Sequence, residues 1–178
     1  MSITQFNATY TLEEDRVLFR FNTSQSQEYR LWLTRLVVRD ILALGEQASV
    51  AVLAREHMPE QAKAIDEFKQ QAKVQTAKFS TFVPATHFPL GAEPLLVHKV
   101  RVGLEKEATA LELQLPKGQV LTLRLNEEMM GQLRLLLQTI EQRAHWGLAG
   151  AKPLADARAE QKPVADLTDS VALNKVLH

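Results

Sequence analysis

The chain has 178 residues, of which 46% are hydrophobic and 24% are charged, a composition typical of a folded globular protein with its own core. It contains no cysteine, which excludes disulfides, thiolate metal sites and cysteine nucleophiles. Its 21 basic and 21 acidic residues cancel, which argues against an overall field that gathers nucleic acid or anionic lipid. Without a signal-peptide pattern or a run of eighteen apolar residues, the chain is expected to be soluble and cytoplasmic.

Residues 1–58 are predicted to form three strands followed by a helix. Apolar residues alternate with other residues in three segments separated by polar turns, at positions 5–10, 17–21 and 29–33. This pattern is typical of an antiparallel meander with one apolar face. Thr34 then suits the N-cap of a helix, in which apolar residues recur every three or four positions toward Arg55. Gly45 predicts a kink or an early end inside that helix.

A bridging helix is predicted at 59–82, because a proline suits the first turn and good helix formers follow it. Its apolar stripe is narrow and is interrupted by Gln75; the large members are Ile65, Phe68, Phe79 and Phe82. A helix with so narrow a stripe buries little of itself, so we expect it to lie along a groove or to pair with another chain. Residues 83–94 contain three prolines and a glycine and predict a linker.

Residues 95–147 follow the same plan as the first 58. Alternation returns in three segments, at positions 100–104, 111–115 and 121–125. Asn126 suits the N-cap of a second long helix, and Gly147 is its expected end. The matching order of strands, turns and caps predicts an α+β fold of duplicated βββα units, in which antiparallel meanders pack against long helices.

This order of several strands and then a helix is similar to the layout of the PUR and Whirly-type single-strand-binding folds. The repeats of those folds have four strands, whereas this sequence predicts three in each unit. A likeness of layout alone implies no function.

Residues 148–178 are predicted to form a mobile tail, in which "KPLAD" at Lys152 recurs as "KPVAD" at Lys162. A segment of this composition is typical of a linker, and it could also carry a docking motif. Apolar residues near helical spacing close the chain, at Leu167, Val171, Leu173, Val176 and Leu177. They predict a short terminal helix that folds back onto this protein or docks on another copy.

No pattern in the sequence indicates catalysis. The five histidines show no metal-ligand spacing, the serines lack the glycine-flanked elbow of a nucleophile, and the scattered glycines form no phosphate loop. We therefore expect a protein that is not an enzyme and that uses no cofactor or metal.

The most distinctive candidate site is the outer face of the first predicted sheet. The residues opposite its core phase include Leu18, Arg20, Arg30 and Trp32. Such a basic-aromatic patch suits a protein interface or the stacking of single-stranded bases; alternatively, Trp32 packs beneath a helix or the linker.

These observations favour a protein-interaction or assembly protein that forms homo-oligomers. A single-stranded nucleic-acid-binding protein that uses the outer sheet face is the alternative. Self-association is the expected partnership, another protein or a nucleic acid is a further option, and a membrane is not expected.

Overall fold

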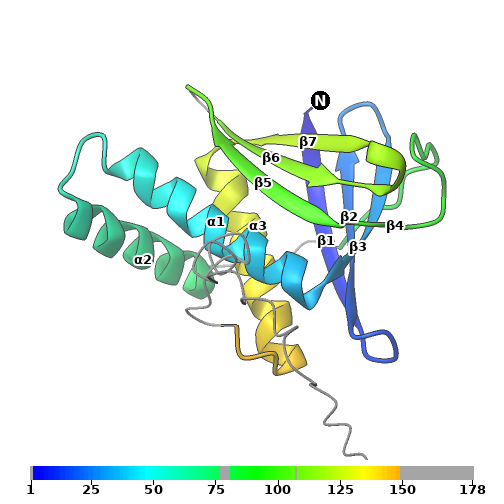
Figure 1. Cartoon of the computed structure of the whole chain (residues 1–178), viewed down its shortest axis with the longest axis horizontal. Coiled ribbons are helices and arrows are strands. Elements are labelled where there is room, and N and C mark those ends of the chain that lie inside the picture. Colours follow the sequence, from blue (N-terminus) through cyan, green and yellow to red (C-terminus); the bar gives the residue numbers. More distant parts are fainter. Residues whose placement is uncertain (1, 77–80, 107, 149–178) are drawn as a thin grey trace, which may run out of the picture.

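The computed structural model describes residues 2–76, 81–106 and 108–148, which form an α+β fold of two sheets and three α-helices (Figure 1). The elements in chain order are β1 (Ile3–Thr11), β2 (Arg16–Thr23), β3 (Glu28–Thr34), α1 (Arg35–Leu53), α2 (Pro59–Thr76), β4 (Leu95–Leu96), β5 (Lys99–Leu104), β6 (Thr109–Gln114), β7 (Val120–Leu125) and α3 (Glu127–Ala144). None of these helices is long and apolar enough to cross a bilayer.

The first sheet has the order β1-β2-β3-β4, and its first three strands form the predicted antiparallel meander. The predicted core phase is confirmed, because Val17, Phe19 and Leu31 are almost completely buried. The two-residue strand β4 pairs in parallel with β3 and was not predicted. Two residues are too few to produce a period-two pattern.

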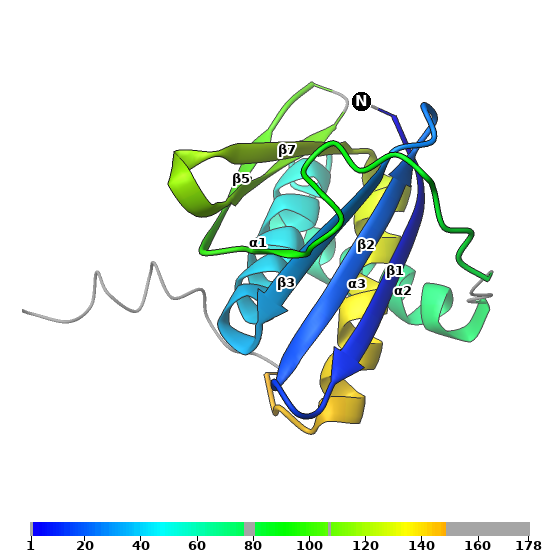
Figure 2. The ribbon, with the colours of Figure 1, turned by 90° about the vertical axis from the view of Figure 1, so that its right-hand side faces the viewer.

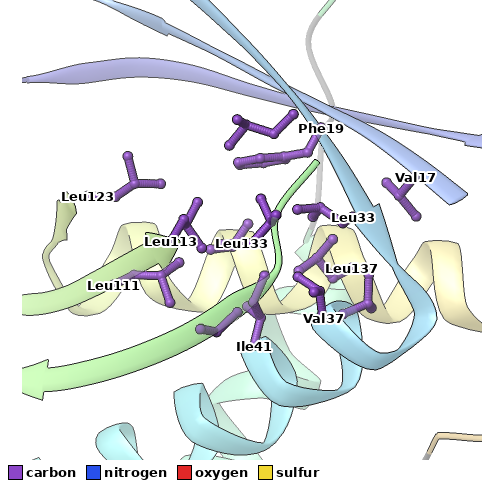
Figure 3. Packing of buried hydrophobic residues seen from close by; sticks show 14 of the residues in the cluster. Val17, Phe19, Leu33, Val37, Ile41, Leu111, Leu113, Leu123, Leu133 and Leu137 are labelled. Carbon is purple, nitrogen blue, oxygen red and sulfur yellow. The ribbon is translucent and has the colours of Figure 1, made fainter. Parts of the chain in front are cut away.

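The second sheet has the antiparallel order β5-β6-β7. Its inner side chains join those of the first sheet and of both long helices in a single core (Figure 3). Leu111, Leu113 and Leu123 come from this sheet, whereas Phe19 comes from the first. The alternation predicts that Leu104 faces the core, but this residue lies at the end of its strand and is 43% exposed.

Each long helix crosses toward the sheet that it does not directly follow. Among the strands, helix α1 packs chiefly against β5, and helix α3 packs chiefly against β1 (Figures 1 and 2). Covering the apolar face of either sheet therefore requires a helix from the other half of the chain. The two halves share one hydrophobic core, so removing one half would expose apolar surface on the other.

Both helix caps were predicted correctly, whereas two predicted helix ends were wrong. The Thr34 hydroxyl accepts from the amide of the third following residue, as does the Asn126 side chain. Helix α3 ends at Ala144, ahead of Gly147, because His145 adopts the left-handed conformation that closes the last turn. Helix α2 ends at Thr76, so Phe82 lies outside it.

Helix α1 continues through Gly45 without the predicted kink or end. The glycine lies where α1 approaches α3 closely, since a Cβ atom at this position would lie 3.2 Å from Met130 Sδ and 3.3 Å from Arg134 Cδ. The absence of a side chain allows this approach, which outweighs the weak helix propensity of glycine.

Asp15, in the turn between β1 and β2, ties the end of α3 to the first sheet. Its Oδ1 accepts hydrogen bonds from Trp146 Nε1 at 2.7 Å and from the Tyr10 hydroxyl at 2.9 Å, and its Oδ2 accepts one from Arg35 at 3.0 Å. Bonds from Trp146, Arg35 and Tyr10 hold the pKa of Asp15 below its ordinary value. The same bond to Asp15 raises the pKa of the Tyr10 hydroxyl.

We expect this cluster to make stability depend on acid pH. Because the pKa of Asp15 is lowered by folding, its contribution is present above the ordinary value of 3.8 and is lost as the pH falls through the folded value. Asp15→Asn keeps the shape and removes the charge, so urea unfolding should show the largest difference from wild type near neutral pH. A difference of the same size in acid would contradict this prediction.

Candidate interaction surfaces

Helix α2 packs against α1 and α3 at the end of the molecule away from the first sheet (Figure 1). Its buried side chains are Ala62, Asp66 and Gln70, which recur every four residues and therefore share one side of the helix. Two of the three are polar. The inner side of the helix therefore contains two polar side chains, whereas the inner side of an amphipathic helix is usually apolar.

A buried ion pair fixes this side of α2 to α3. The two guanidinium nitrogens Nη1 and Nη2 of Arg134 donate to the two carboxylate oxygens of Asp66, both at 2.9 Å, and both side chains are less than a tenth exposed. Arg134 Nη1 also lies 3.3 Å from Ser49 Oγ on α1. The bidentate contact therefore links α2 to α3, and the Arg134 bond to Ser49 adds α1.

Further polar contacts flank the ion pair. Gln70 donates to the carbonyl of Gly131 at 3.2 Å and to the Gln138 side chain at 3.4 Å. Lys69 reaches Glu127, at the start of α3, at 2.7 Å. These contacts are directional, so they hold α2 in one rotational setting about its own axis.

In that setting the predicted apolar stripe faces outward. Phe68 is 72% exposed, Ala64 and Ala72 are exposed, and Ile65 is half-buried. We call these four residues the outer stripe of α2. Of the other predicted members, Phe82 lies outside the helix and Phe79 lies outside the described residues.

The first sheet brings the four predicted patch residues together on its outer face. Leu18 pairs across the strands with Trp32, and Arg20 pairs with Arg30. All four side chains are half-buried. The sequence therefore placed this group correctly, although its surroundings differ from the predicted open basic patch.

Residues 81–94 cross this outer face as a strap, which consists of the predicted linker, 83–94, and the two residues before it (Figure 2). Gln5 holds it on β1 by donating to the carbonyl of Thr81 at 2.8 Å and accepting from the amide of Val83 at 3.1 Å. On β3, the Glu28 carboxylate accepts from the amide of Ala85 at 3.0 Å. Glu28 is completely buried as a result.

The strap also occupies the two central arginines of the patch. Arg20 donates to Asn7 at 2.7 Å and lies over the ring of Phe82, 4.5 Å from its centroid. Arg30 pairs with Glu28 at 2.7 Å and lies 4.4 Å from the ring centroid of Phe88. One face of each guanidinium group is therefore covered by an aromatic ring of the strap.

Sequence reasoning missed both the polar contacts of Asp66 and Gln70 on the buried side of α2 and the strap. The contacts that define them join residues 57 to 78 positions apart, and such distances leave no periodic signal. The predicted tail residues, Leu167 to Leu177, lie outside the described residues.

The described residues contain no group of three or more His, Asp or Glu side chains that could hold a metal ion. No protein-family model matches the chain, and no curated protein or solved structure matches it.

Removing one partner of the Asp66–Arg134 pair should lower the free energy of unfolding far more than replacing both partners with apolar residues. Asp66→Ala leaves a buried guanidinium without its carboxylate and should lower the free energy of unfolding by about 3–5 kcal/mol, whereas Asp66→Leu with Arg134→Met should be nearly neutral or stabilising. Urea unfolding measures both variants. Glu67→Ala is the control, because Glu67 forms only an exposed pair with Lys63 on the same helix. The prediction would be contradicted if Asp66→Ala lowered the free energy of unfolding no more than Glu67→Ala does.

Proposed function

We propose that this chain is a non-enzymatic protein-interaction or assembly protein that associates with copies of itself. The observation that supports this most directly is the setting of α2, which buries Asp66 and exposes Phe68 at 72%. Burying a large apolar side chain is worth about 1.5–3 kcal/mol. A partner that covers Phe68 would recover this free energy.

The energetics of the buried ion pair also support the proposal. Removing two charges from water offsets most of their attraction, so such a pair adds little net stability compared with apolar packing. Rotating α2 about its axis would bury Phe68 and Ile65 and return Asp66 to water. The observed setting is the one that keeps the outer stripe available to a partner.

A single-stranded nucleic-acid-binding protein is the second candidate, and the outer face of the first sheet favours it. Trp32 lies beside Leu18 and near Arg20, and aromatic rings and guanidinium groups stack on bases. The strap argues against this candidate, because Arg30 is paired with a carboxylate and both arginines already face aromatic rings.

We further propose that the two βββα segments are copies of one unit. The order of elements, the side-chain cap at Thr34 and at Asn126, and the crossing of each helix toward the other sheet support this proposal. Duplication followed by exchange of helices would account for the shared core.

Self-association tests the leading function. Light scattering on the purified chain should show a mass that rises from monomer toward dimer between about 1 and 100 µM, the range expected for a modest apolar contact surface. A mass that remains monomeric throughout this range would remove the proposed function. The measurement should be repeated in high salt, where an apolar association persists while exposed charge pairs are screened.

A fluorescent single-stranded oligonucleotide separates the two candidates. At low salt, where phosphate contacts are strongest, we expect no retardation by the wild-type chain. Retardation that Trp32→Ala weakens, with unchanged thermal stability, would support the nucleic-acid candidate. A large loss of stability in Trp32→Ala would instead show that Trp32 serves the fold.

A further inference from the structure

We propose that two copies of this chain exchange residues 150–155, and that this segment of each copy adds as a short parallel strand to the free edge of β7 in the other. The inference rests on the proposed self-association and deepens it, because it names the segment and the surface that meet. The partner is a second copy of this chain.

The outer edge of β3 shows how a short strand covers a sheet edge in this fold. The Glu28 amide donates to the carbonyl of His87 at 2.8 Å, and the Trp32 carbonyl accepts from the amide of Val97 at 3.0 Å. Strand β4, Leu95–Leu96, pairs in parallel with the same edge. The backbone groups that β3 directs away from β2 are therefore bound by a later part of the same chain.

The equivalent edge of β7 is open. The closing bond of the β6–β7 hairpin, from the Leu115 amide to the Gln119 carbonyl, sets the alternation along both strands. The backbone groups of Val120, Thr122 and Arg124 then point away from β6, as do those of β3 at the positions 92 residues earlier. No described residue forms a backbone hydrogen bond to these three groups of β7. Such a row of unpaired donors and acceptors is a template for a further strand.

The sequence that leads into β4 recurs after α3. "GAEPL" occupies positions 91–95 and "GAKPL" occupies positions 150–154, so the two differ only at the charged residue. In the first occurrence Gly91 turns the chain with a φ of 92°, a conformation that favours glycine. The leucine that follows the proline is the first residue of β4. The recurrence therefore keeps both the residue that turns the chain and the residues that begin the strand.

Chain length indicates that the segment on β7 comes from a second copy. The bond from Trp146 to Asp15 holds the end of α3 at the turn after β1, whereas β7 lies at the end of the sheet where β1 begins (Figures 1 and 2). Strand β1 has nine residues, so its two ends are about 26 Å apart. The chain from Leu148 to position 154 spans at most about 21 Å. The segment of the same chain therefore falls short of β7.

The register of the added strand follows from the first sheet. Strand β4 meets β3 at Leu31 and Trp32, and the positions 92 residues later are Leu123 and Arg124 in β7. The same register places the leucine of "GAKPL" beside Leu123, which faces the core, and the following alanine beside Arg124. In a symmetric dimer each copy gives one segment and receives one, so this contact forms twice.

Engineered disulfides test the strand and its source, because the chain contains no cysteine of its own. An Arg124→Cys chain mixed with an Ala155→Cys chain should form a linked dimer under mild oxidation, since paired strands lie about 4.8 Å apart, within the roughly 7 Å limit for a disulfide. Ala159→Cys is the matched control. It lies about 13 Å farther along an extended chain and should link to Arg124→Cys far more slowly.

Arg124→Pro tests the edge of β7. Proline removes an N–H that points away from β6, a change that an edge strand tolerates. It should raise the dissociation constant of the dimer at least about tenfold, because the backbone bond is lost at both contacts. Arg124→Thr is the matched control, since it removes the same guanidinium group and keeps the N–H; it should leave the constant unchanged. Sedimentation equilibrium measures both, and circular dichroism confirms that each variant is folded.

Leu154→Asp tests the segment itself. It places a charge on the apolar side of the added strand and should also raise the dissociation constant at least about tenfold. Val164→Asp is its control, because Val164 follows the later proline of the similar "KPVAD"; it should leave the constant unchanged. If Val164→Asp weakens the dimer and Leu154→Asp does not, residues 150–155 are not the strand on β7.

The outcomes separate this inference from the proposed function. A monomeric wild-type chain removes both. A wild-type chain that associates overturns the strand exchange alone if Leu154→Asp and Arg124→Pro associate equally well. If Arg124→Pro does not fold, Leu154→Asp decides, because position 154 lies outside the described residues. A chain with both Arg124→Cys and Ala155→Cys that closes its disulfide within one copy would also overturn the exchange.

Discussion

The buried pair of Asp66 and Arg134 determines which side of α2 faces the solvent. Both carboxylate oxygens are engaged at 2.9 Å, so removing one charged group leaves the other buried without its partner. Such a pair is a strong constraint on geometry even where its net contribution to stability is small. The position of Phe68 follows from it, since the two residues lie on opposite sides of one helix.

That constraint depends in turn on the crossing of the long helices. Arg134 lies on α3, which packs chiefly against β1, while Ser49 lies on α1, which packs chiefly against β5. The groove that receives α2 is therefore formed by helices from both halves of the chain. Gly45 allows the close approach of α1 to α3 that brings Arg134 into this groove.

The core and the strands could be predicted because their signal is local. Alternation along β2 placed Phe19 inside and Arg20 outside, and both assignments are correct. The apolar stripe of α2 was also visible, but its direction was not, because a helical period shows which residues share a side and not which side faces the protein. Choosing the side required Arg134, which lies 68 residues away.

The strap was hidden for a related reason. Its proline-rich composition predicts a linker, yet its backbone is held by Gln5 and Glu28 on the sheet. Backbone groups carry no sequence identity, so a side chain that binds them leaves no complementary residue to find. Glu28 is completely buried, yet in the sequence it looks like one more polar residue of an outer face.

The balance of basic and acidic residues is reflected in ion pairs within the molecule. Several arginines bind partners within the same molecule: Arg134 binds Asp66, Arg30 binds Glu28 and Arg35 binds Asp15. Basic groups used in this way are less available to a polyanion, because each is already compensated by a carboxylate. The side chains that we propose for contact with a partner are aromatic: the half-buried Trp32 on the first sheet and the exposed Phe68 on α2. Recognition by such surface depends on shape and burial more than on charge, which is the reason we propose a protein partner rather than a nucleic acid.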